Sequence, residues 1–176
     1  MMTELEICNW ALLKLGQRPL ENWNERSLKA DYCRLLLPPI HKGLLRSFSW
    51  SFATQSMDLL PLYFTYNGEL KYYIPLKCLK VLNTSEETQL RGRCIVARGD
   101  TPRPLSLKYI GEVPLSDCDP LYQEAFALKL AGELCPPLIM DDQMRSYLKG
   151  ESERVLAVAM DMDGVEIPED RGYHNG

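Results

Sequence analysis

The hydrophobic residues of this chain change their spacing at one point, in the stretch LLRSFSWSFA (residues 44–53). Before it they recur every three or four positions, as on one face of a helix. Within it Phe48, Trp50 and Phe52 alternate with serines, as side chains do in a strand. Because a helix and a strand have different periods, the sequence predicts a structural junction formed by these three aromatic residues.

Two helices are predicted before the junction, over about residues 3–15 and 27–47. The first opens with the capping-box pattern TELE and stops at a Leu-Gly pair. The second contains Pro38 and Pro39 in its middle. Each proline ring removes a backbone donor and crowds the preceding turn, so we expect two helical pieces that meet at an angle.

Short runs rich in β-branched and aromatic residues follow the junction, separated by Pro, Gly and Asn. They cover about residues 50–112 and indicate a small antiparallel sheet. The turn YNGE supports this interpretation, because Asn67 and Gly68 can take the positive φ of a tight hairpin.

Two further helices are predicted after the strands, over about residues 119–135 and 142–162. The third helix begins at an Asp-Pro pair, which suits the N-cap and the first helical position, and is expected to stop before a Pro-Pro pair. Residues 164–176 show little periodicity, so they are predicted to form a flexible C-terminal tail.

The predicted order lacks the strand–helix alternation of a parallel α/β sheet. We therefore predict an α+β fold, mainly a helical bundle of about four helices with an inserted small antiparallel β subdomain, in a single domain over residues 1–163. The length of 176 residues, with 45% hydrophobic and 25% charged residues, is typical of one globular domain.

The net charge of −4 argues against a protein whose main task is to bind phosphates, since that affinity comes from lysines and arginines. The N-terminus is acidic where a signal peptide would be basic. No apolar run approaches the roughly 18 residues that a membrane helix needs. We therefore expect a cytosolic protein without a membrane partner.

Six widely spaced cysteines, without a CxxC pair, are expected to be reduced and mostly buried thiols. With only His41 and His174, the chain is predicted to hold no metal cluster. A cysteine-dependent hydrolase would need one thiol to meet a histidine that a third group orients, and this is the least favoured interpretation. Since nucleotide-binding and nucleophile-elbow motifs are absent, we predict no enzyme and no cofactor.

The stretch MDMDG spaces Asp161 and Asp163 like the start of a calcium loop. Val165 and Gly172 stand where the loop would need further ligands. We interpret the two acids as helix-end solvation and capping.

The densest basic run is RGRCIVARGDTPR, which supplies four arginines: Arg91, Arg93, Arg98 and Arg103. One interpretation is a solvated hairpin edge that resists aggregation. The other is a contact patch for a polyanion or for an acidic neighbouring chain.

Four stretches in order resemble the tail tubular protein A-like head-to-tail connectors (adaptors) of short-tailed bacteriophages: ICNWALLKLGQRPLENWNE, KADYCRLLLPPIHKGLLRSFSWSFA, LKYYIPLKCLKVLN and PLYQEAFALKLAGELC. In that family the first helix ends in a Leu-Gly turn, and a long second helix ends in an aromatic-Trp-x-Phe-Ala junction that leads into a strand. The resemblance covers about residues 4–160. The Pro-Pro pair of the second helix and the C-terminal tail depart from the family pattern.

The resemblance implies a structural virion protein rather than an enzyme. Family members form a homo-oligomeric ring, dodecameric in number, that binds the portal protein, extends the DNA channel and receives the tail nozzle. This implies a location in the neck of the virion after assembly in the host cytoplasm, with DNA passing without specific binding. In the tail, Val165, Ile167 and Tyr173 are expected to contact the portal. The alternative is a small DNA-associated helical module, which would need a basic helix face.

Overall fold

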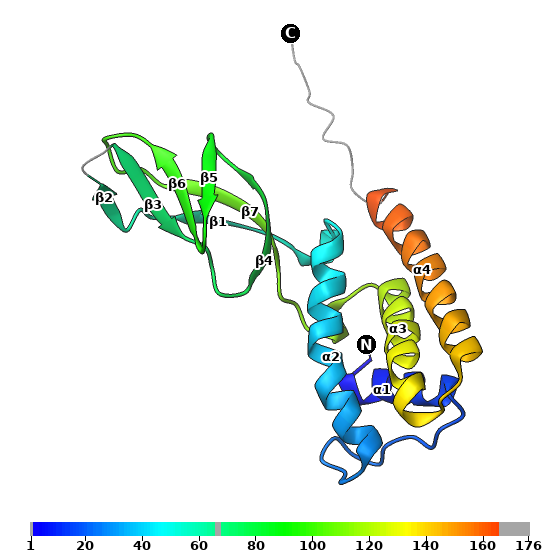
Figure 1. Ribbon diagram of the computed structural model, residues 1–176. Helices are drawn as coiled ribbons and strands as arrows, with labels where there is room; N and C mark the ends of the chain where they lie inside the picture. Colours follow the sequence, from blue (N-terminus) through cyan, green and yellow to red (C-terminus); the bar gives the residue numbers. More distant parts are fainter. Residues whose placement is uncertain (1, 66–67, 166–176) are drawn as a thin grey trace. The chain divides into compact units, whose positions relative to one another are not determined.

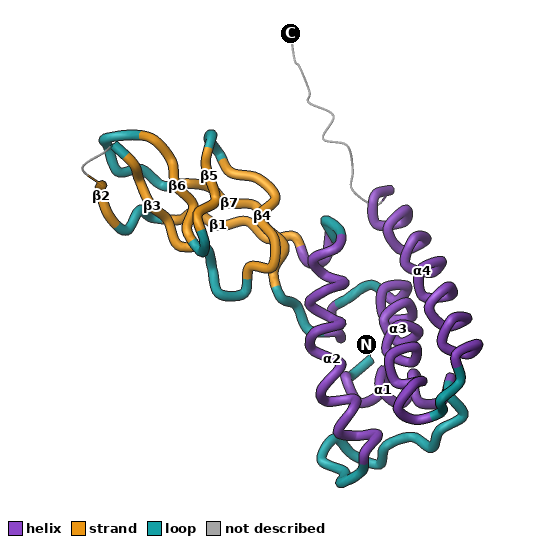
Figure 2. Tube along the Cα trace, viewed as in Figure 1, coloured by secondary structure: helices purple, strands orange, loops and turns teal. Residues whose placement is uncertain are grey.

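Helices and strands occupy separate stretches of the chain (Figures 1 and 2). The computed structural model describes residues 2–65 and 68–165. Over these residues, two α-helices precede seven antiparallel strands, and two α-helices follow them. This confirms the α+β fold predicted from the sequence.

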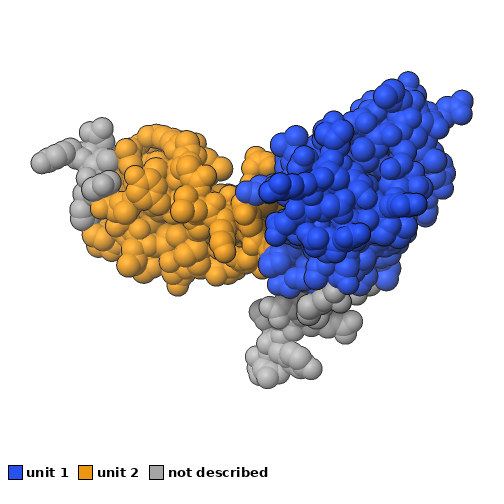
Figure 3. Space-filling model, turned by 90° about the horizontal axis from the view of Figure 1, so that it is seen from below, with its two compact units in different colours: residues 1–44, 50–52, 114–176 blue, residues 45–49, 53–113 orange. Residues whose placement is uncertain are grey.

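The chain packs as two compact units (Figure 3). The helical unit comprises residues 1–44, 50–52 and 114–176, and the β unit comprises residues 45–49 and 53–113. The sequence predicted a single domain over residues 1–163. Within that range, the inserted strands form a compact unit with its own core.

Helix α1 (Glu4–Lys14) has the predicted ends. The Thr3 side chain accepts a hydrogen bond from the Glu6 amide, and the Glu6 side chain accepts one from the Thr3 amide. After the helix, Gly16 adopts a φ of +67°, a conformation that glycine takes without a steric penalty.

Helix α2 (Leu28–Ser47) runs without interruption through Pro38 and Pro39. The prediction of two separate helical pieces was therefore wrong. Both prolines are exposed, so water can hydrate the carbonyls that lose an amide partner. The opposite side of the helix is anchored by buried side chains: Ala30, Cys33, Leu37 and Leu44.

Helix α3 (Pro120–Leu138) is buried on most of its circumference, as its apolar residues predicted, and packs against α1 and α4. Its Asp119 cap accepts hydrogen bonds from two backbone amides. The helix ends at Leu138 rather than at 135. The helix continues through Pro136 and Pro137, and the Ile139 amide still donates to the Cys135 carbonyl at 2.8 Å.

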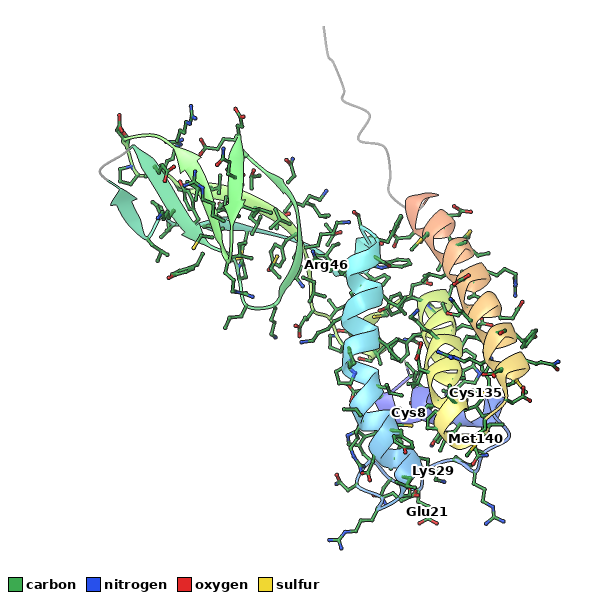
Figure 4. The ribbon with its side chains drawn as sticks, viewed as in Figure 1. Cys8, Glu21, Lys29, Arg46, Cys135 and Met140 are labelled. Carbon is green, nitrogen blue, oxygen red and sulfur yellow. The ribbon has the colours of Figure 1, made fainter. Side chains whose placement is uncertain are left out.

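A tight turn connects α3 to helix α4 (Asp142–Val165). Cys135 and Met140 lie at this turn (Figure 4), where Met140 has a φ of 58° and the Cys135 thiol donates to the Asp141 carbonyl at 3.3 Å. Helix α4 extends beyond the predicted end at 162, so the first two residues of the predicted tail are helical. Residues 166–176 lie outside the described part of the chain.

The strands form two antiparallel sheets, where the sequence predicted one. The three-stranded sheet has the order β1-β7-β4 and the four-stranded sheet the order β2-β3-β6-β5. Their bounds are β1 (Thr54–Leu59), β2 (Tyr63–Thr65), β3 (Glu69–Tyr73), β4 (Cys78–Thr84), β5 (Thr88–Arg91), β6 (Cys94–Arg98) and β7 (Leu105–Gly111).

The core of the β unit combines alternate residues of both sheets. Its buried residues are Leu59, Leu70, Tyr72, Ile95, Ala97, Leu105, Leu107 and Tyr109. Each sheet therefore buries one face, and a single sheet would have left this apolar face in water. The short loop between β5 and β6 depends on Gly92, whose φ is +63°. Of the hairpin turn predicted at YNGE, Asn67 lies outside the described residues.

The first and last strands of the insertion are direct neighbours. Strand β1 pairs with β7, with Thr54 opposite Ile110 and Leu59 opposite Leu105. The chain thus enters and leaves the β unit at adjacent positions in one sheet.

Candidate functional site

The junction after α2 is a loop and a short 3₁₀ helix, η1 (Ser51–Ala53), and the first strand begins at Thr54. The prediction of a strand from about residue 50 was therefore wrong, although the helix does end at Ser47. Phe48 is half-buried and belongs to the β unit, whereas Trp50 and Phe52 belong to the helical unit. The three residues thus mark the boundary between the units.

Trp50 and Phe52 form an aromatic cluster with Tyr122 of α3. The Trp50 and Phe52 rings are stacked with centroids 5.4 Å apart. The Tyr122 ring meets Trp50 edge-on at 5.2 Å and Phe52 edge-on at 5.3 Å. His41 of α2 extends the cluster, 5.9 Å from Tyr122 and 5.8 Å from Phe126. Stacked and edge-on arrangements are those that aromatic rings favour.

The polar atoms of this cluster are also paired. The Trp50 indole donates to the Leu44 carbonyl, in the last turn of α2, at 3.0 Å. The Tyr122 hydroxyl donates to the His41 carbonyl at 3.2 Å and lies 2.9 Å from His41 Nδ1. Burial raises the pKa of Tyr122, so the hydroxyl stays a donor.

A buried carboxylate fixes the 3₁₀ helix of the junction. Asp163, near the end of α4, accepts hydrogen bonds from the Ser51 amide at 3.0 Å and from the Ser51 hydroxyl at 2.6 Å. Its exposed fraction is 7%. The interpretation of Asp163 as a solvated helix-end acid is therefore wrong, because the side chain is buried and bonds a residue 112 positions away in the sequence.

The return from the β unit is fixed by another buried polar side chain. A second 3₁₀ helix, η2 (Leu115–Asp117), precedes α3. The Gln123 amide donates to the carbonyls of Leu115 and Cys118 at 2.8 and 3.1 Å. Both connections to the β unit are therefore held by hydrogen bonds within the helical unit.

The four predicted patch arginines lie around β5, β6 and the loop before β7, but they differ in their partners. Arg91 pairs with Glu69 at 3.0 Å, and Arg103 forms a two-bond pair with Glu86. Arg93 donates to the Pro75 carbonyl at 3.2 Å. Arg98 is exposed and forms no ion pair with a described residue.

All six cysteines are free thiols, and four are buried. Burial raises the pKa of Cys78, and it raises the pKa of Cys118 to about 12. A hydrogen bond between Cys8 and Cys33 raises the pKa of Cys8 and lowers that of Cys33, but the Cys33 side chain is 0% exposed. Reactive cysteines combine a low pKa with access, and Cys33 lacks access.

Two further predictions concern histidine and metals. His41 Nδ1 faces the Tyr122 hydroxyl, and His174 lies outside the described residues. Among residues 2–65 and 68–165, no three His, Cys, Asp or Glu side chains are grouped as metal ligands.

No helix in the described part of the chain is both long and apolar enough to cross a membrane.

The predicted portal-contact residues are mostly beyond the described chain. Val165 is the last residue of α4, and Ile167 and Tyr173 lie outside the described residues.

Sequence reasoning located the junction but did not assign a role in it to four residues that hold it: His41, Tyr122, Gln123 and Asp163. The identities of these residues did not indicate a role at the junction, because each acts through a partner on another element. The His41–Tyr122 pair, for example, spans 81 residues.

A scan against protein-family models matches none of them to this chain, and a search of curated proteins returns no similar sequence.

Proposed function

We propose that this protein is a head-to-tail connector, a structural virion protein that forms a ring between the portal and the tail and extends the DNA channel. The observation that carries the proposal is the junction. The motif of Trp50 and Phe52, part of the resemblance to tail tubular protein A-like connectors, lies where the chain leaves the helical unit for the inserted β unit.

The order of elements supports the same proposal. The chain forms two helices, then a block of strands, then two more helices. The four stretches that resemble the connector family follow one another in the same order. The polar groups of the junction make hydrogen bonds within the fold. Such an arrangement suits a scaffold whose task is to hold surfaces for neighbouring subunits.

The partners proposed on this basis are further copies of the chain in a dodecameric ring, the portal protein and the tail nozzle, in the neck of the virion. Assembly would take place in the host cytoplasm. DNA would pass through the ring without specific binding, which the net charge of −4 supports, since a wall that bound phosphates tightly would hold the DNA back.

Mass photometry of the chain alone and after mixing with the cognate portal ring tests this function. The expected result is a portal complex whose mass has grown by one copy of the chain per portal subunit. A portal ring that gains no mass at any salt concentration would rule out the connector function.

A truncated chain tests the predicted contact by the C-terminal tail. Deletion of residues 166–176 is expected to weaken binding to the portal while the thermal unfolding of the remaining chain is unchanged, because the deletion leaves residues 142–165 of α4 in place. Equal binding by the truncated and full chains would remove the tail from the proposal.

A further inference from the structure

Positive and negative residues are unequally divided between the two units. The β unit contains nine Lys and Arg against six Asp and Glu, which gives a net charge of +3. The helical unit contains eleven Lys and Arg against eighteen Asp and Glu, a net charge of −7. The net charge of −4 for the whole chain hides this separation.

Part of the positive charge lies on one sheet face. In the four-stranded sheet, Leu70, Tyr72, Ile95 and Ala97 face the core, so the residues between them point away from it. We call this second side the outer sheet face and define it by Glu69, Lys71, Arg91, Val96 and Arg98. The register joins them directly, with Glu69 opposite Arg98 and Lys71 opposite Val96.

Of the five residues that define the outer sheet face, three are cations and one, Glu69, is a carboxylate. Glu69 pairs with Arg91 at 3.0 Å. Neither Lys71 nor Arg98 forms an ion pair with a described residue. These two charges are therefore available to a partner.

The carboxylates beside these cations favour a protein over a nucleic acid. A hollow of about 310 Å³ at this face is lined by Glu69, Glu86 and Glu87 as well as by Arg91 and Arg98. Carboxylates among the cations repel phosphates, whereas mixed charges match a protein surface that offers both signs.

We propose that the outer sheet face of one copy docks on the acidic helical unit of a second copy. The two patches are different, so the contact is heterologous, and repetition of such a contact closes a ring or extends a filament. The inference rests on the ring of the proposed function and names the surfaces that join its subunits. Because salt screens exposed charges, the contact weakens as ionic strength rises.

Zero-length carbodiimide crosslinking tests the contact, since it joins a lysine only to a carboxylate that touches it. Equal amounts of ordinary and ¹⁵N-labelled full-length chain are mixed at about 0.02 M and about 0.5 M salt. The expected product is a mixed-isotope peptide pair that joins Lys71 to an Asp or Glu of residues 114–165, formed at low salt only. If every crosslinked pair that contains Lys71 carried a single isotope, the crosslinks would lie within one copy of the chain, and the proposal would be overturned.

A charge-reversal variant with a matched control supplies the second arm. Lys71→Glu with Arg98→Glu is expected to weaken self-association at low salt by at least about tenfold in sedimentation velocity. Lys77→Glu with Lys108→Glu changes the charge equally at two exposed lysines away from the outer sheet face, and is expected to associate like the wild type. Equal losses in both variants would overturn the proposal, because they would indicate unspecific charge attraction.

Two outcomes separate this inference from the proposed function and from nucleic-acid binding. If the Lys71/Arg98 variant adds to the portal ring and self-associates like the wild type, the docking surface is wrong and the connector function stands. If the wild type binds duplex DNA at physiological salt and the Lys71/Arg98 variant does not, the face binds a nucleic acid and the proposal fails.

Discussion

Trp50 is the residue on which the junction most depends. Its side chain is 0% exposed, contacts Phe52 and Tyr122, and satisfies a carbonyl at the end of α2. Removal of this side chain would leave a cavity and would also remove a buried hydrogen bond.

The Trp50→Ala variant is accordingly expected to lose about 3–5 kcal/mol of unfolding free energy, measured by urea denaturation. Trp10→Ala is the matched control, because Trp10 is only half-buried on α1 and should cost less than half as much. Equal midpoints for wild type and Trp50→Ala would show that the aromatic cluster does not stabilise the fold.

Asp163 acts through charge-assisted hydrogen bonds to Ser51. In Asp163→Asn the side chain keeps its size but loses the charge, and one amide oxygen replaces two carboxylate oxygens. We expect a loss of about 1.5–3 kcal/mol in the same denaturation assay. Asp161→Asn, two positions earlier and exposed, should change stability by less than about 0.5 kcal/mol, and a similar loss there would contradict the role of Asp163.

At the scale of elements, α2 shows how an exposed face tolerates prolines. A proline inside a helix costs about 3 kcal/mol relative to alanine, but α2 continues because its buried side packs on the rest of the helical unit. Local preference would end the helix, and tertiary packing outweighs it.

Replacement of Pro38 by alanine should therefore stabilise the protein. We expect a gain of about 1–2 kcal/mol, because the recovered helix propensity exceeds the entropy that the unfolded chain regains. Pro104→Ala, at an exposed loop position, should give no gain. Thermal unfolding of both variants checks this, and a Pro38→Ala protein that melts below the wild type would show that α2 requires the proline.

At the scale of the whole molecule, the β unit is an insertion whose two ends are neighbours in one sheet. Adjacent antiparallel strands lie about 5 Å apart, so a short linker can replace the unit. Trp50, Phe52 and Tyr122 belong to the helical unit, as does the Leu44 carbonyl that Trp50 bonds, so these contacts would be retained.

A chain in which about five Gly and Ser residues replace residues 54–112 is expected to fold as a helical protein. Far-ultraviolet circular dichroism should show a cooperative thermal transition, and the fluorescence of Trp10, Trp23 and Trp50 together should keep the component of a buried ring. A non-cooperative transition would mean that the helical unit needs the β unit in order to fold.

The sequence alone determined those features that depend on neighbours in the chain. The capping box of Thr3 and Glu6, the Asp119 cap, the end of α2 at Ser47 and the α+β order all follow from patterns of a few residues. Each is a local balance of hydrogen bonds and hydrophobic spacing, and such a balance is visible in the sequence.

Only the tertiary structure decided the features that join distant residues. It carried α2 and α3 through their prolines, divided the strands between two sheets, and paired Asp163 with Ser51 and His41 with Tyr122. The alternation of Phe48, Trp50 and Phe52 suggested a strand, yet Trp50 and Phe52 both join one cluster through a 3₁₀ turn. The energy of these contacts comes from burial against partners elsewhere in the chain, and no local pattern encodes which partner that will be.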